Sequence, residues 1–302
     1  MRFWLTLMTV GELDQLPELA QHAEACGFHG LTYADHLVMP TQSRSRYPYS
    51  KDGDAFWPVD APWPDPWIVL SVLGAATSRI RLATNIYLAG LRDPFTVARA
   101  VSTAAVLTNE RVVCGISAGW LREEFDAVGV DFESRGRRLD EIIAVARKLW
   151  TGEAVEHRGE FFNFDPVIMQ PVPRNPIPVW SGGISKAALR RAATNDGWLG
   201  VPMSADDNIA IVNQMRAIRA ERGLPADGFT PCISLAGPLE TDSVARMADA
   251  GIRDMTVIPW MATPWDMQAY VAEGADTSLL SVKKDALSRY ADALISRFGS
   301  AD

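Results

Sequence analysis

Residues 179–193 read VWSGGISKAALRRAA, and the order of these residues decides the fold class. A short apolar run ends at two glycines, a serine follows, and strong helix formers (alanine, leucine and arginine) complete the segment. This order predicts a strand, a glycine turn, an N-cap at Ser185 and a helix that begins at Lys186. Because the first N–H groups of a helix are free, the turn is also a candidate site for an anion.

The same alternation of strand and helix patterns recurs along the 302 residues. Strands are predicted at residues 3–7, 30–34, 80–89, 112–117, 179–180, 198–201, 230–235 and 255–258. Helices are predicted at residues 13–26, 66–77, 95–108, 135–151, after Ser185, and at 206–222, 243–250 and 282–298. Eight strands separated mostly by single helices favour an α/β fold of the (β/α)8 TIM-barrel type, formed by one domain spanning residues 1–302. An open, doubly wound sheet is the alternative.

Two stretches interrupt this alternation. Residues 37–66 lack periodicity and are rich in tyrosine, tryptophan, proline and aspartate. Their aromatic content argues against disorder and predicts a lid after the second strand, over an apolar or planar ligand. Residues 154–164, AVEHRGEFFNF, have the character of a hairpin inserted before the fifth strand. Candidate walls for a ring or a substrate are Trp57, Trp63, Trp120 and Trp198, with packing in the core or the lid as the alternative role.

Composition limits the possible partners. The net charge of −8 and the pI near 5.1 argue against binding to nucleic acid or to an anionic membrane surface. No apolar run approaches the roughly 18 residues of a membrane span, and the N-terminal MRFWLTLMTV is predicted to be a strand rather than a signal peptide. Three widely spaced cysteines indicate reduced thiols and a cytoplasmic location. No metal-binding spacing is present, so no metal is predicted.

A barrel carries its active site where the strands end and the following loops begin. Of the four histidines (His22, His29, His36 and His157), only His36 falls at such a position, beside Asp35 after the second strand. His36 is therefore the candidate catalytic residue. A histidine that merely satisfies local hydrogen bonds is the alternative.

Residues 115–119, GISAG, match the G-x-S-x-G elbow of serine hydrolases. A hydrolase of this type needs an acid and then a histidine after its serine. Only His157 follows Ser117, and it lies far from the end of the chain. The glycines, including Gly119, more simply let the backbone pass close to a flat ligand, and the serine hydrolase is kept as a remote alternative.

Longer segments resemble a known family. Residues 114–164 (beginning CGISAGWLREEF), residues 176–199, the lid segment YPYSKDGDAFWPVDAPWPDPW (47–67) and LATNIYLAGLRDP (82–94) are similar to the luciferase-like flavin-dependent oxidoreductases. Within them the resemblance is strongest to an actinobacterial branch that uses coenzyme F420, a deazaflavin. It implies a barrel, usually dimeric, with the flavin or deazaflavin across the carboxyl ends of the strands.

The resemblance also implies a cofactor site. In the family, the positions of Asp35 and His36 contact the ring near its reactive edge, and Asn85–Ile86 form a non-proline cis peptide against the ring. The positions of Ser181, Gly182, Gly183 and Ser185 form the phosphate cradle, so the anion sought in the turn would be a cofactor phosphate. The full set of implied cofactor contacts is Asp35, His36, Thr84, Asn85, Ile86, Gly119, Trp120, Ser181, Gly182, Gly183 and Ser185.

The resulting expectation is an F420-dependent oxidoreductase. It would transfer a hydride between C5 of the deazaflavin and a small, apolar or planar substrate under a lid that includes Trp57 and Trp63. The alternatives are an FMN-dependent monooxygenase that uses reduced FMN and oxygen, and a barrel that only binds cofactor. Family members that oxidise sugar phosphates carry an acidic glutamate where this chain has Trp120, with Glu123 and Glu124 a turn further on. That activity is therefore not predicted.

Overall fold

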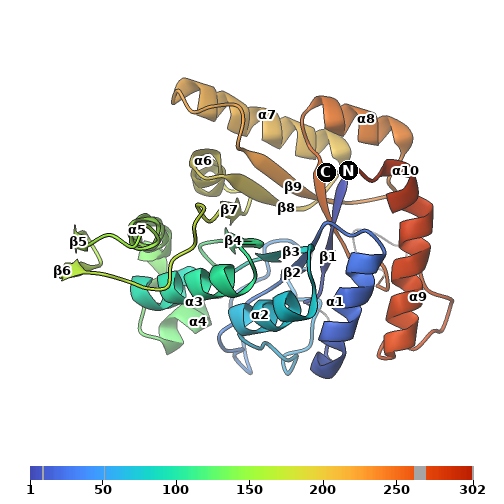
Figure 1. Ribbon diagram of the computed structural model, residues 1–302, viewed down its shortest axis with the longest axis horizontal. Coiled ribbons are helices and arrows are strands. Elements are labelled where there is room, and N and C mark those ends of the chain that lie inside the picture. Colours follow the sequence, from blue (N-terminus) through green and yellow to red (C-terminus); the bar gives the residue numbers. More distant parts are fainter. Residues whose placement is uncertain (9, 51, 262–269, 301–302) are drawn as a thin grey trace.

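The computed structural model describes residues 1–8, 10–50, 52–261 and 270–300, and its central feature is a closed barrel of parallel strands (Figure 1). The barrel strands are β1 (Arg2–Thr6), β2 (Gly30–Tyr33), β3 (Arg81–Thr84), β4 (Val112–Ile116), β7 (Val179–Gly182), β8 (Gly197–Met203), β9 (Thr230–Leu235) and β10 (Asp254–Val257). Strand β10 pairs in parallel with β1 and closes the ring. The prediction of a (β/α)8 barrel is confirmed.

Two tryptophans fill the interior of the barrel. The rings of Trp4 and Trp180 meet edge to face at 5.2 Å and pack with Ala83, Val113, Leu199 and Cys232. Glycines on the neighbouring strands make this possible, because a Cβ at Gly30 would lie 2.1 Å from the ring of Trp4 and a Cβ at Gly197 would lie 2.4 Å from the ring of Trp180. Large and small residues thus alternate around the barrel and leave no pore.

Helices surround the strands (Figure 1). They are α1 (Leu16–Ala25), α2 (Pro66–Ala76), α3 (Pro94–Leu107), α4 (Arg122–Ala127), α5 (Arg135–Leu149), α6 (Lys186–Thr194), α7 (Ala205–Glu221), α8 (Thr241–Asp249), α9 (Leu280–Tyr290) and α10 (Ser296–Phe298). Neighbouring helices pack together from α1 to α3 and α5, from α6 to α8, and between α9 and α1. Asp65 and Asp93 cap α2 and α3 by accepting two backbone N–H groups each, and a proline follows each aspartate. These Asp-Pro pairs explain why both helices begin where they do.

The predicted lid and hairpin are both present. Between β2 and α2 the chain forms no helix or strand among the described residues, which exclude Lys51 of this segment. The hairpin consists of β5 (Val155–Arg158) and β6 (Asn163–Val167) and lies beside α5, at the end of the molecule away from α9 (Figure 1). Glu141 of α5 holds it by accepting the N–H groups of Phe161 and Phe162.

Several predicted boundaries differ from the structure. The strand predicted at 80–89 ends at Thr84, and a short 3-10 helix (Ala89–Leu91) occupies the end of the predicted range. Helix α4 was not predicted. The last helix is interrupted by a π-helical segment (Ala291–Ile295). None of the helices in the described ranges has the length and apolar character needed to span a membrane.

Candidate active site

A cavity of about 230 Å³ opens at the carboxyl ends of the barrel strands. The lid supplies five aromatic residues to its wall: Tyr47, Tyr49, Phe56, Trp57 and Trp63. Nine of the residues singled out from the sequence line it: Asp35, His36, Trp57, Trp63, Asn85, Ile86, Trp120, Gly182 and Gly183. The barrel therefore brings together residues that are up to about 150 positions apart in the chain, as parallel strands do at one edge.

Three indole rings lie around the side chain of His36. Its ring meets Trp63 edge to face at 4.6 Å, and the rings of Trp57 and Trp120 lie at 5.7 and 6.1 Å. The residue is buried. The indole rings cover part of this imidazole, and one acidic side chain lies beside it.

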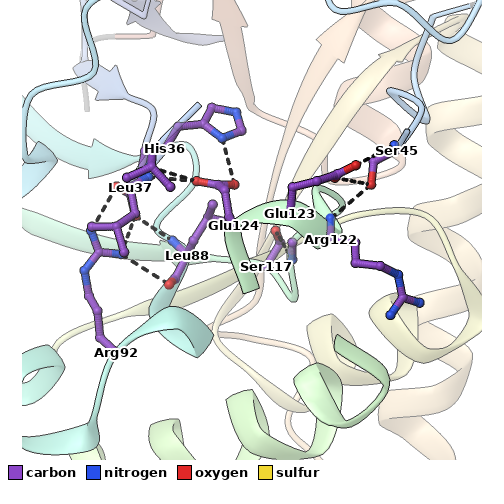
Figure 2. Close-up of polar contacts among 12 residues, drawn as sticks. His36, Leu37, Ser45, Leu88, Arg92, Ser117, Arg122, Glu123 and Glu124 are labelled. Carbon is purple, nitrogen blue, oxygen red and sulfur yellow. Dashed lines mark hydrogen bonds and ion pairs between the residues drawn. The ribbon is translucent and has the colours of Figure 1, made fainter. Parts of the chain in front are cut away.

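That neighbour is Glu124, which the sequence did not single out as a site residue. Its Oε2 lies 3.0 Å from Nδ1 of His36, and its Oε1 accepts the backbone N–H of Leu37 at 2.8 Å (Figure 2). Glu124 is fully buried in the first turn of α4. A signal was present in the sequence: an acidic residue one step before the apolar Phe125, which is itself buried in the small cluster with Leu88 and Leu91.

The adjacent Glu123 points the other way, toward the lid (Figure 2). Its carboxylate accepts the N–H groups of Arg44 (2.6 Å) and Ser45 (3.2 Å) and the hydroxyl of Ser45 (2.7 Å). Burial alone would raise the pKa of Glu123, but these hydrogen bonds outweigh it and lower the pKa to about 2. Helix α4 therefore connects the lid to His36.

Asp35 lines the cavity, but its carboxylate is occupied by contacts within the protein. Its carboxylate makes a bidentate pair with Arg92 (2.7 and 3.1 Å) and accepts the N–H of Leu88 at 2.9 Å. Burial raises the pKa of Asp35, against the lowering effect of Arg92. The contact to Leu88 fixes the chain just after the Asn85–Ile86 cis peptide, which is present as the resemblance implied. Asp35 thus supports the wall of the cavity that Ile86 forms.

The turn after β7 has the features of a phosphate cradle. Gly183 has φ +102°, a conformation closed to most other residues, and a Cβ at Gly182 would lie 3.0 Å from Cδ1 of Ile86. Ser185 caps α6 by accepting the N–H of Ala188 at 3.2 Å. In the described part of the chain, the N–H groups of Gly183, Ile184 and Ser185 have no acceptor. Free N–H groups at a helix start suit an anionic oxygen.

Four further residues expected at the cofactor do not line the cavity. Thr84 and Ser181 are buried between strands, where the hydroxyl of Thr84 bonds Gly115 and that of Ser181 bonds the amide of Asn195. Gly119 has φ +83° and lies against Phe125, and Ser185 is exposed at the helix start. These residues shape the site from behind or beside it.

The prediction that Trp198 walls the cavity is wrong. Its side chain is fully buried in the hydrophobic core and its indole Nε1 donates to the carbonyl of Gly183 at 3.0 Å. The register of β7 with β8 pairs Ser181 with Trp198, and alternation along β8 then sends this ring outward, under the helices. Trp198 instead holds the glycine turn.

The charge of the cavity wall is low. Among the lining residues that the structure describes there is no lysine, arginine or glutamate. Asp35 is paired with Arg92, and His36 with Glu124. Burial raises the pKa values of Tyr47 and Tyr49, so both phenols stay neutral. Ser117 also lines the cavity, but its hydroxyl accepts the N–H of Gly119 at 3.3 Å and bonds no histidine of the described chain, which gives no geometric support to a serine hydrolase.

Comparison with known proteins agrees with this architecture. The family model for luciferase-like monooxygenases matches residues 1–286. The uncharacterized protein Rv0940c of Mycobacterium tuberculosis is 34% identical over 279 residues, which cover 92% of this chain and 94% of the relative. An F420-dependent glucose-6-phosphate dehydrogenase of Nakamurella multipartita is 30% identical over 182 residues, 59% of this chain and 49% of that protein. The crystal structure of the monooxygenase RslO1 from Streptomyces bottropensis has a TM-score of 0.72 and 17% identity, covers 99% of this chain and 100% of its own, and shares the fold.

Proposed function

Because the chain belongs to the luciferase-like monooxygenase family, we propose that it is an F420-dependent oxidoreductase acting on a small, uncharged, apolar or planar substrate. The observation that carries the proposal is the cavity at the strand ends, which combines His36, a glycine cradle with free N–H groups and an aromatic lid, and has no cationic side chain in its described wall. When bound, the deazaflavin supplies a hydride donor or acceptor at C5.

The residues present fit such a cofactor. Gly182 and Gly183 leave space that a Cβ would fill, and the N–H groups that follow them suit a phosphate oxygen. The Asn85 side chain lines the cavity and has no hydrogen-bond partner within the described chain. The buried indole N–H groups of Trp57 and Trp63 also lack partners there. A polar ring edge would satisfy groups of this kind.

The chain's own contribution is proton handling and exclusion of water. His36 would give a proton to the reacting substrate atom or take one from it, a role that typically contributes about 10²–10⁴-fold in rate. The lid aromatics would keep the reacting atoms dry and oriented. His36→Ala should therefore leave the fold and cofactor binding intact and lower turnover within that range. Unchanged turnover by cofactor-loaded enzyme would remove this role.

The uncharged wall supports an uncharged substrate. A phosphate or carboxylate substrate would need a free arginine, lysine or N–H cluster beside the reacting atoms, and among the described lining residues only the cradle has such N–H groups. Trp120 also occupies the position where the family's sugar-phosphate dehydrogenases carry an acid. Glucose 6-phosphate, the substrate of the Nakamurella relative, is therefore not proposed for this chain.

A second function uses the same site with reduced FMN and oxygen, as a monooxygenase. The description of the matching family favours it, and a flavin ring with a phosphate fits the same platform. Paired titrations of the purified protein with oxidised F420 and with FMN separate the two, read by quenching of its ten tryptophans. Micromolar binding of F420 with much weaker FMN supports the proposal. The reverse order favours the monooxygenase, and binding of neither removes both.

We also propose that the chain forms a homodimer in the cytoplasm. Two apolar side chains one turn apart on α2, Ile68 (68%) and Val72 (50%), are exposed. Analytical ultracentrifugation should give a dimer that Ile68→Lys dissociates. The matched control is Ile168→Lys, because Ile168 is equally exposed (68%) beyond the hairpin. A monomeric wild-type protein would refute the dimer.

A further inference from the structure

We propose that Glu124 is a positioning residue that holds the His36 imidazole in one tautomer, with the proton on Nδ1 and with Nε2 free at the cavity. The inference deepens the proposed function, on which it rests, because it concerns how His36 is prepared for proton transfer. It follows from three features: the contacts of the Glu124 carboxylate, its burial, and the surroundings of Nε2.

The contacts of Glu124 assign its two oxygens. Oε1 accepts the backbone N–H of Leu37 at 2.8 Å and approaches the N–H of Val38 at 3.5 Å. Oε2 lies 3.0 Å from Nδ1 of His36. A backbone N–H can only donate, so the Leu37 contact fixes Oε1 as an acceptor.

Burial then decides what Nδ1 must do. The Glu124 side chain is 1% exposed, and among the described residues it forms an ion pair with no lysine or arginine. A buried carboxylate needs donors for its oxygens, and the donor available to Oε2 is the imidazole. The hydrogen bond between the two side chains therefore requires the proton on Nδ1.

The second nitrogen is left for the ligand. Within the described chain no group hydrogen-bonds Nε2 of His36, while its ring is held among Trp57, Trp63 and Trp120. A neutral imidazole carries one proton. With that proton on Nδ1, Nε2 has a lone pair that can accept a proton from a substrate O–H and later return it. Glu124 itself does not touch the cavity.

The test is the tautomer of His36 in ligand-free protein. Long-range ¹H–¹⁵N correlation spectra, recorded where the imidazole is neutral, distinguish a protonated from an unprotonated ring nitrogen, and His36→Gln identifies the His36 signals among the four histidines. We expect Nδ1 to be protonated and Nε2 unprotonated. The opposite pattern in the wild-type protein would overturn the proposal, and this measurement needs no variant at Glu124.

Glu124→Gln should reverse the pattern. The amide oxygen can keep the N–H of Leu37, while the amide NH₂ can only donate to Nδ1, so the ring proton moves to Nε2. Turnover should fall by about 10²–10⁴-fold, within the range of lost acid–base catalysis. A folded Glu124→Gln protein whose His36 tautomer is unchanged would also overturn the proposal.

A matched control exists in the same chain. Glu141 pairs with Nε2 of His157 at 2.9 Å and also accepts two backbone N–H groups, but this pair lies at the hairpin, outside the cavity. Glu141→Gln should alter the His157 signals and leave those of His36 and the turnover unchanged. Because the spectra are recorded without cofactor, a failure of F420 to bind would refute the proposed function while leaving this test to stand or fall on its own.

Discussion

Replacing Glu123 with glutamine should weaken the attachment of the lid residues Arg44 and Ser45 to α4. The carboxylate of Glu123 accepts three hydrogen bonds from two consecutive residues, Arg44 and Ser45. Glutamine keeps one acceptor oxygen and loses the charge, so at least one of these donors is left without its charged partner. Hydrogen bonds to a charged group contribute about 1.5–3 kcal/mol each, and we expect Glu123→Gln to weaken the attachment by about 1–3 kcal/mol.

The low pKa of Glu123 gives a consistent magnitude. A pKa lowered from 4.5 to about 2 corresponds to at most ~3 kcal/mol of preference for the ionised side chain, and partial solvent screening reduces this. Because the pKa is lower in the folded protein, this stabilisation is complete above about pH 4.5 and is lost as the pH falls through about 2. In Glu123→Gln the attachment should not depend on pH in that window.

Amide hydrogen exchange measures this effect directly. The exchange of the N–H groups of Arg44 and Ser45, corrected for intrinsic rates, should be about 5–150-fold faster in Glu123→Gln at neutral pH. The N–H of Leu37, which bonds Glu124, serves as the internal reference. Glu133→Gln is the matched control, because Glu133 pairs with the exposed Arg122 and makes no hydrogen bond or ion pair with the described residues of the lid. Equal exchange at residues 44 and 45 in wild type and Glu123→Gln would refute the reasoning.

Three further substitutions test the parts of the site that support the cavity. Asp35→Ala should lower the free energy of unfolding by about 3–5 kcal/mol in urea titrations, because it removes the carboxylate from the Arg92 side chain, which is only 10% exposed. Asp165→Ala breaks an exposed pair and should cost at most about 1 kcal/mol, and equal losses would contradict this. Gly183→Ala, at φ +102° and with its Cβ 3.1 Å from that of Ala188, should weaken F420 binding measured by tryptophan quenching, while Gly223→Ala (φ +65°, open space) should not. Trp198→Phe removes the hydrogen bond to the Gly183 carbonyl and should lower the free energy of unfolding by about 1–3 kcal/mol without changing substrate preference. A changed substrate preference would show that Trp198 does contact the substrate.

The parts of the fold that could be predicted are those governed by local order. The Gly-Gly-Ser-helix sequence after residue 180 predicted both the turn and the Ser185 cap, and the structure has both. The alternation of apolar runs and amphipathic stretches predicted all eight barrel strands in the described chain. Asp35 and His36 could be placed at the site because they directly follow a strand, and in a barrel that position alone is informative.

The parts that could not be predicted depend on contacts between distant residues. Glu124 meets His36 across 88 positions, and its helix has only six residues, too few to show periodicity. Trp198 was misassigned because the side of the sheet that a strand residue faces depends on its register with β7, which sequence alone does not give. The pairing of Asp35 with Arg92 likewise spans 57 positions. In each case the sequence shows the residue type but not the distant residue that it contacts.

The two neighbouring glutamates of α4 bear on how a ligand enters. Glu124 accepts the N–H of Leu37, and Glu123 accepts the N–H groups of Arg44 and Ser45. Both ends of the stretch 37–45 are therefore hydrogen-bonded to α4. The described residues from Tyr47 to Trp63, which exclude Lys51, carry the aromatic rings of the cavity wall, and the N–H of Tyr47 donates to the carbonyl of Gly53. We expect these residues to move away from the cavity when a ligand enters, while α4 and the residues attached to it stay in place. This movement would take Trp57 and Trp63 away from the His36 ring. Glu124 lies outside the moving portion, so its contact with Nδ1 would keep the histidine in place each time the site opens.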